Sequence, residues 1–77
     1  MNEKEKLLKS IAEIQEKINN YNREDAINLI KKVRFEHPGK EQIAYVTFNI
    51  PLEKGTDVDI IKTLEAEKAR LILKLQD

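Results

Sequence analysis

The sequence predicts an α+β fold in which a helix, a β-hairpin and a second long helix follow one another in αββα order. Three observations predict it. Apolar residues recur at alternating spacings of four and three over residues 2–21, fill every second position of one strand face over residues 42–51, and return to helical spacing over residues 56–76. We expect the two terminal helices to pack as a short coiled-coil-like pair against the sheet.

The first helix is expected over about residues 2–21. Its apolar positions form one heptad seam: Leu7, Ile11, Ile14, Ile18 and Tyr21. Asn2 can cap the start, with Glu5 three residues later in an asparagine variant of the capping box. The asparagine-rich segment 19–22 is expected to end the helix, because asparagine favours turns and tolerates the left-handed conformation.

Residues 23–30 fit either a helix or a strand. One set of apolar residues matches a helix and an overlapping set matches one strand face: Ala26, Leu29, Ile30 and Val33 for the helix, and Leu29, Val33 and Phe35 for the strand. Asn22 before two acidic residues favours a helical turn at the beginning. Over about residues 29–37 we prefer a strand, because the pattern alternates and runs into the turn dipeptide Pro38-Gly39.

The second strand of the hairpin is expected over about residues 42–51, which is the clearest strand pattern in the chain. Its two faces are Ala44, Val46, Phe48 and Ile50 on one side, and Ile43, Tyr45, Thr47 and Asn49 on the other. Pairing with residues 29–37 would leave the hairpin with one apolar face.

The last helix is expected over about residues 56–76, with Thr56 and Asp59 forming a start like a capping box. Its main apolar stripe consists of Ile61, Leu64, Leu71, Ile72 and Leu75. A second stripe consists of Ile60, Ala66, Ala69 and Leu73. The first helix and the hairpin can cover only one side of this helix, so we expect the second stripe to be the interface with another protomer. The alternative is a frayed end or another packing of the monomer.

Size and composition also favour an oligomer. A chain of 77 residues with 40% hydrophobic side chains allows one domain, residues 1–77, with a marginal core. With Cys 0, neither a disulfide nor a thiolate metal site can stabilise it. The formal net charge of +0 argues against generic nucleic-acid binding. Since the chain shows neither a membrane-spanning apolar run nor a signal-peptide pattern, we expect no membrane partner and a cytoplasmic location.

Few residues suit catalysis, and we expect no catalytic residue, no metal site and no cofactor. The chain holds one histidine and one serine and has no phosphate-binding glycine loop. Ser10 is expected on the exposed flank of the first helix and His37 in a solvated turn, so that neither has a base or an orienting acid nearby. Asp57 and Asp59 are better explained by helix capping than by a cation site.

The outer face of the predicted hairpin is the candidate ligand site. It would hold Lys32, Arg34, Tyr45, Thr47 and Asn49. Cations beside an aromatic ring and hydroxyl groups can hold a phosphate and stack a base. The alternative is structural, with Arg34 and Tyr45 as an ordinary cross-strand pair and the lysines keeping the sheet soluble.

The predicted function is that of a non-enzymatic, homo-oligomeric protein-interaction module, such as a small phage- or plasmid-type inhibitor or adaptor of another protein. Its partners would be a second copy of itself and a host or other protein. The alternative is a protein that sequesters a small anionic ligand such as a nucleotide on the hairpin face. A third class, an enzyme, has no supporting motif in the sequence.

Overall fold

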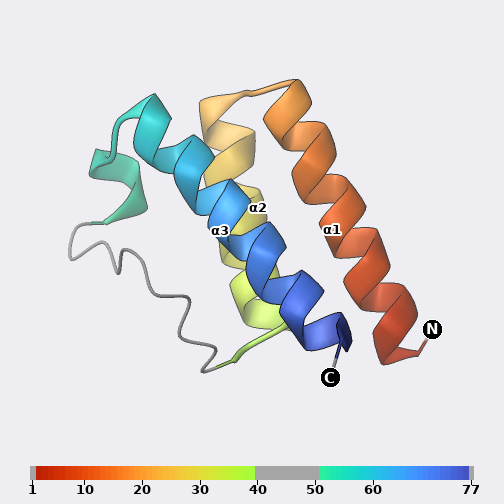
Figure 1. Ribbon diagram of the computed structural model, residues 1–77. Helices are drawn as coiled ribbons and strands as arrows, with labels where there is room; N and C mark the ends of the chain where they lie inside the picture. The colour runs from red at the N-terminus through yellow and green to blue at the C-terminus, as the bar shows by residue number, and fades with distance from the viewer. Residues whose placement is uncertain (1, 40–50, 77) are drawn as a thin grey trace.

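The computed structural model describes residues 2–39 and 51–76, and within these ranges all of the secondary structure is helical, with no strand (Figure 1). Its elements are α1 (Glu3–Asn19), α2 (Arg23–Glu36), a single 3₁₀ turn η1 (Leu52–Lys54) and α3 (Asp57–Gln76). The terminal helices agree with prediction. The predicted α+β fold is wrong, because residues 29–36, assigned to the first hairpin strand, belong to α2. Most of the second predicted strand, residues 42–51, lies outside the described residues.

Helix α1 begins and ends where the local sequence indicates. The side-chain oxygen of Asn2 accepts a hydrogen bond from the backbone N–H of Glu5 at 2.8 Å, which satisfies one of the free donors at the helix start. The helix ends at Asn19, and the N–H of Asn20 still bonds to the Glu16 carbonyl at 2.9 Å. The predicted cap at Asn2 is therefore confirmed.

Helix α2 forms because its cap and its apolar spacing agree. The Asn22 side chain accepts from the N–H of Asp25 at 3.1 Å, so the predicted helical beginning is confirmed. Ala26, Ile30 and Val33 then recur at spacings of four and three and are all buried. In a strand, by contrast, Phe35 would share the apolar face, yet its side chain is 86% exposed. The helical period therefore decides the conformation of this segment.

Helix α3 starts with a reciprocal pair of hydrogen bonds between Thr56 and Asp59. The Thr56 N–H donates to Asp59 Oδ2 at 3.0 Å, and the Asp59 N–H donates to Thr56 Oγ1 at 3.2 Å. These bonds confirm the predicted capping box.

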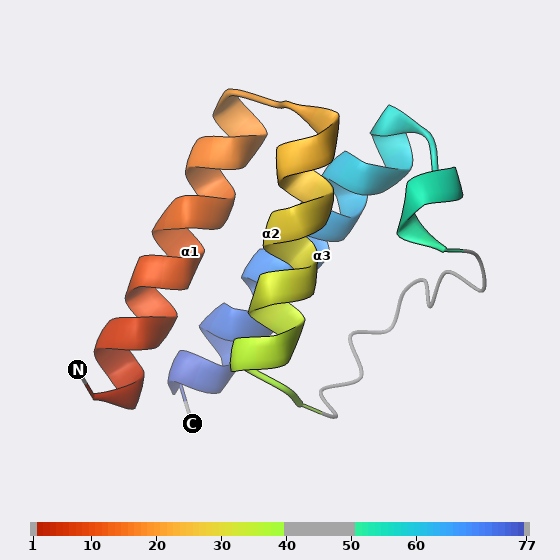
Figure 2. The same ribbon diagram turned by 180° about the vertical axis from the view of Figure 1, so that it is seen from behind.

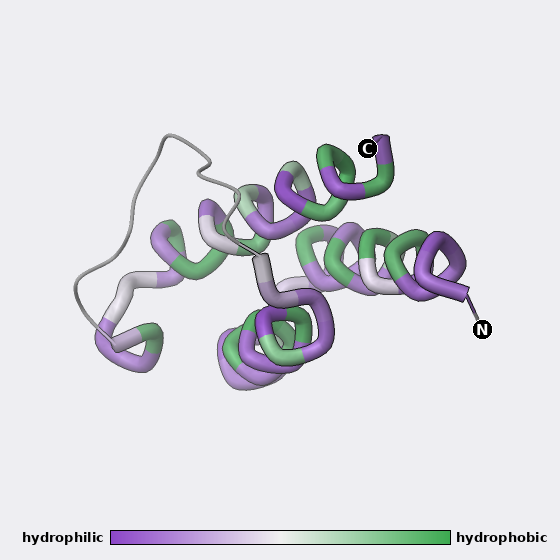
Figure 3. The backbone as a smooth tube through the Cα atoms, turned by 90° about the horizontal axis from the view of Figure 1, so that it is seen from below, coloured by the Kyte–Doolittle hydropathy of each residue, from purple (hydrophilic) through white to green (hydrophobic). Residues whose placement is uncertain are grey.

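The three helices enclose one core. Helix α3 runs antiparallel to α1 and packs along both α1 and α2, which contact each other much less (Figures 1 and 3). The buried apolar residues are Leu7, Ile14, Ala26, Ile27, Ile30, Val33, Ile60, Leu64 and Leu71. From their connecting turn, α1 and α2 diverge toward the end of the molecule where the chain begins (Figure 2).

No helix in the part of the chain that the structure describes is long and apolar enough to cross a membrane.

Candidate functional site

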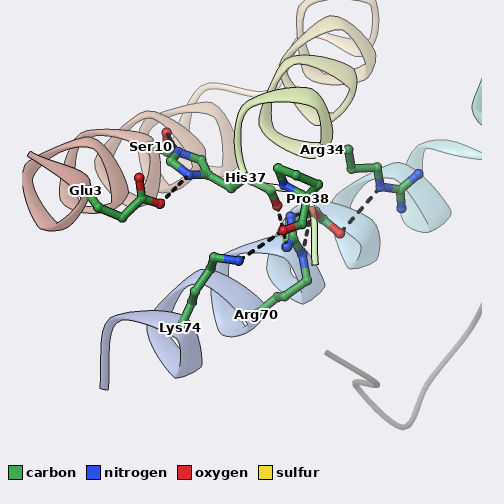
Figure 4. A network of polar contacts seen from close by, with 8 residues as sticks. Glu3, Ser10, Arg34, His37, Pro38, Arg70 and Lys74 are labelled. Atoms are coloured by element: carbon green, nitrogen blue, oxygen red, sulfur yellow. Dashed lines mark hydrogen bonds and ion pairs between the residues drawn. The ribbon is translucent and has the colours of Figure 1, made fainter. Parts of the chain in front are cut away.

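A buried serine–histidine pair lies where α1 and α2 diverge (Figure 4). Ser10 Oγ lies 3.1 Å from His37 Nε2, and the two residues are only 4% and 2% exposed. The expectations of a serine on an exposed flank and a histidine in a solvated turn are wrong. Because α2 is a helix, His37 follows Val33 by four residues on the same inward face. Ser10 lies on the face of α1 that carries Leu7 and Ile14.

The second ring nitrogen of His37 has an acidic neighbour but no hydrogen bond. Glu3 Oε1 lies 3.4 Å from Nδ1, which is within ion-pair range. The contact does not have hydrogen-bond geometry, and Nδ1 is a buried polar atom without a hydrogen-bond partner. Since buried polar groups are nearly always hydrogen-bonded, this unsatisfied nitrogen marks the site as unusual.

The backbone of the same residue is held by α3. Arg70 Nη1 donates to the His37 carbonyl at 2.7 Å, and Lys74 Nζ donates to the Pro38 carbonyl at 3.0 Å (Figure 4). The carbonyl groups at a helix C-terminus lack intrahelical partners and carry partial negative charge. The two cations therefore fix the end of α2, and with it the position of the imidazole ring.

A buried ion pair orients Arg70. Its Nε and Nη2 donate to Glu67 Oε1 at 3.1 and 2.8 Å, and both side chains are almost fully buried. Arg34, at the surface of α2, lies 3.5 Å from the other carboxylate oxygen of Glu67. The Glu67 carboxylate and the Arg70 guanidinium therefore compensate each other's charge where α2 packs against α3.

A pocket of about 330 Å³ lies between α1 and α2 next to the serine–histidine pair. Its lining is Glu3, Lys6, Lys9, Ser10, Glu13, Lys32, Glu36 and His37. Lys32 Nζ lies 3.4 Å from Glu13 Oε2, so these two charges offset each other. Over residues 2–39 and 51–76 the ammonium groups of Lys6 and Lys9 make no ion pair or side-chain hydrogen bond.

The order of atoms from Glu3 through His37 to Ser10 is that of a hydrolase triad. Ser10, however, is buried and lies well inside α1. Backbone N–H groups there bond to carbonyls of the preceding turn, so none is free to stabilise an oxyanion at the serine. The geometry favours binding at this pocket over nucleophilic catalysis.

Two residues of the predicted ligand site, Lys32 and Arg34, lie in the described part of the chain. Lys32 and Arg34 lie on α2 and not on a hairpin, and they have different partners, Glu13 on α1 and Glu67 on α3. Only Lys32 reaches the pocket. Tyr45, Thr47 and Asn49 lie outside the described residues. The sequence contains a signal for the pocket that was missed: Glu3 and Ser10 are seven residues apart on one face of a predicted helix.

The predicted interface residues divide into two groups. Ile60 belongs to the core of the chain itself, packed with Leu64 and Leu71. Ala66 and Ala69 are half-buried, and Leu73 is 51% exposed. Three of the four residues are therefore accessible on the side of α3 that faces away from the core.

A second polar cluster lies at the opposite end of the molecule. Asp57 Oδ1 accepts from the Tyr21 hydroxyl at 2.8 Å and from Arg23 Nη1 at 3.1 Å. Arg23 also donates to the Glu53 and Gly55 carbonyls at 2.8 and 2.6 Å. The hydrogen bonds from Tyr21 and Arg23 lower the pKa of Asp57, while partial desolvation followed by the bond to Asp57 raises the pKa of Tyr21.

Two further carboxylates near this cluster have lowered pKa values. In Glu53 the first cause is the hydrogen bond from Lys31, and in Asp59 it is the hydrogen bond from the Thr56 N–H. This cluster holds the start of α3 against the turn between α1 and α2.

No family model, curated protein or solved structure matches this chain.

Proposed function

We propose that the chain is a non-enzymatic protein-interaction module that pairs with a second copy of itself through the outward side of α3. The observation that carries the proposal is a stripe on this helix, called here the outer stripe: Val58, Lys62, Ala66, Ala69 and Leu73. Its spacings of four, four, three and four place all five residues on one face, opposite the buried Leu64 and Leu71. Val58 and Leu73 are among the large apolar side chains that the described surface exposes.

The outer stripe suits a twofold partner because it is self-complementary. Two copies of α3 packed antiparallel about a point between Ala66 and Ala69 would place each Ala66 opposite the other copy's Ala69. The small side chains allow the helix axes to approach closely. Leu73 of each copy would then cover the aliphatic stem of Lys62 of the other. Such an arrangement is isologous and closes after two copies.

Light scattering coupled to size exclusion, at micromolar concentration, tests this proposal. The wild-type chain is expected at about twice its 9.0 kDa mass, and Leu73→Glu at the mass of one chain. Leu73 is half exposed in the protomer, so this variant is expected to keep the helical circular dichroism spectrum.

Leu8→Glu is the matched control, because it places the same charge at a leucine of α1 that is 46% exposed. It is expected to remain a dimer. A monomeric wild-type chain would overturn the proposal, and so would a Leu8→Glu variant that dissociates as fully as Leu73→Glu.

The proposed role as an adaptor or inhibitor of another protein rests on Phe35. This ring is on α2, whereas the outer stripe is on α3, and it is the most exposed large apolar side chain in the described residues. Aromatic side chains often anchor protein interfaces. The proposed dimer would present two such rings, one from each copy, to a further protein.

A further inference from the structure

The pocket between α1 and α2 combines three features that point to a ligand. It has a volume of about 330 Å³, it is lined by the buried His37, whose Nδ1 has no hydrogen-bond partner, and its wall carries Lys6 and Lys9 without side-chain partners among the described residues. We propose that this pocket binds a small phosphate-type oxyanion, with His37 Nδ1 and the two ammonium groups as donors. The site is independent of the outer stripe on α3.

The serine–histidine pair prepares the ring for this role. When the Ser10 hydroxyl donates to Nε2 across their 3.1 Å contact, the ring proton lies on Nδ1, which then donates. A protonated ring also donates from Nδ1. Arg70 holds the His37 carbonyl from the other side, so the ring is fixed before a ligand arrives (Figure 4). A preorganised donor loses little freedom on binding.

Glu3 shows that an oxyanion fits beside this nitrogen. Its carboxylate lies 3.4 Å from Nδ1, although most of its side chain is exposed to solvent. A ligand oxyanion would take this position and Glu3 would move into solvent. Glu3 therefore competes with the ligand for the same donor.

The donor set favours a phosphate group over a carboxylate. Lys6, Lys9 and His37 offer donors from α1 and from the end of α2, and a phosphate group has enough oxygens to accept from each. Glu13 is already offset by Lys32. Glu36 also lines the pocket, and its carboxylate repels an anion. We therefore expect a dissociation constant on the order of millimolar for free inorganic phosphate.

Nuclear magnetic resonance provides a direct test because the chain has one histidine, whose ring signals are therefore unique. Inorganic phosphate is titrated into the full chain at constant pH, with chloride holding the ionic strength constant. The His37 ring signals and the Ser10 amide are expected to shift and to saturate together. Shifts that rise linearly without saturation, or that leave His37 unmoved, would overturn the proposal.

Surface variants separate the site from general charge effects. The double variant Lys6→Gln/Lys9→Gln is expected to weaken phosphate binding about fivefold or more, and Glu3→Gln to tighten it about threefold. Lys4→Gln is the control, because it removes one positive charge from α1 at a residue that does not line the pocket. Equal losses in Lys4→Gln and in the double variant would contradict a defined site.

The phosphate titration and the light-scattering experiment on the dimer can fail independently of each other. The pocket lies between α1 and α2, whereas the outer stripe lies on α3. Leu73→Glu is therefore expected to bind phosphate as the wild-type chain does, and a loss of binding in this variant would contradict the assignment of the site to one protomer.

Discussion

The hydrogen bond between Ser10 and His37 is the main polar contact in the interior between α1 and α2. Both residues are almost fully buried, and the two are 27 positions apart in the chain. A polar group that is buried with a partner contributes modestly to stability, whereas one that is buried and then loses its partner costs considerably more. The pair therefore fixes which face of α2 can approach α1.

Replacing Ser10 by alanine is expected to destabilise the chain by about 1–2 kcal/mol, because His37 Nε2 would then be buried without a partner. Helix propensity alone predicts the opposite sign, since alanine is the better helix former by about 0.5 kcal/mol. Urea unfolding followed by circular dichroism at 222 nm measures the difference. Asn28→Ala, at an exposed position of α2, is the control and is expected to gain a few tenths of a kcal/mol. A Ser10→Ala chain as stable as the wild type would refute the argument.

At the scale of elements, α1 and the start of α3 were predictable because their signals are local. Asn2 caps α1 through Glu5, three residues away, and Thr56 and Asp59 cap α3 across the same distance. These hydrogen bonds need no contact from elsewhere in the chain. The apolar spacing of both helices then supplies the face that packs into the core.

Helix α2 was only half predictable. Its beginning has a local cap at Asn22, but its end depends on contacts from α3 that the sequence does not reveal. The alternation around Arg34 resembled a strand, yet Arg34 reaches Glu67 and Phe35 points to solvent. A strand over residues 29–37 places His37 beside a turn, and this interpretation hides its contact with Ser10. The error in one element therefore concealed the candidate site.

The end of α2 is expected to depend strongly on Arg70. Arg70→Met would leave Glu67 buried with only the longer contact to Arg34 and would remove the donor to the His37 carbonyl. Breaking a buried pair in this way is expected to cost about 3 kcal/mol, measured by urea unfolding.

Two variants control this experiment. Arg34→Met removes the half-exposed partner of the same carboxylate and is expected to cost less than about 1 kcal/mol. The double variant Arg70→Met/Glu67→Met removes both buried charges and is expected to recover part of the loss, because no isolated charge remains. Equal costs for Arg34→Met and Arg70→Met would show that burial of the pair is not the deciding factor.

For the whole molecule, the two ends of the bundle are held by different chemistry. At the end where α1 begins, the cations Arg70 and Lys74 bind the carbonyls that follow α2. At the other end, carboxylates accept hydrogen bonds, and the pKa values of Glu53, Asp57 and Asp59 lie below their ordinary values of 4.5, 3.8 and 3.8. Acid is therefore expected to weaken the second end.

The sign of the acid effect follows from the direction of these shifts. A carboxyl group whose pKa is lower in the folded chain than in the unfolded chain stabilises the fold above its unfolded pKa. This contribution is lost as the pH falls through the folded pKa. The free energy of unfolding is therefore expected to decrease from about pH 5 downward, measured by urea unfolding at a series of pH values.

Asp57→Asn isolates one part of this dependence. The variant removes the titrating group that Tyr21 and Arg23 bind, so its stability is expected to be lower at neutral pH and to decline less steeply in acid. The loss at neutral pH should be modest, because this carboxylate is largely exposed to solvent. Glu16→Gln, at an exposed position of α1, is the control and is expected to keep the slope of the wild-type chain. If Asp57→Asn also kept that slope, the cluster around Asp57 would not contribute to acid sensitivity, and the carboxylates of Glu53 and Asp59 would have to account for it.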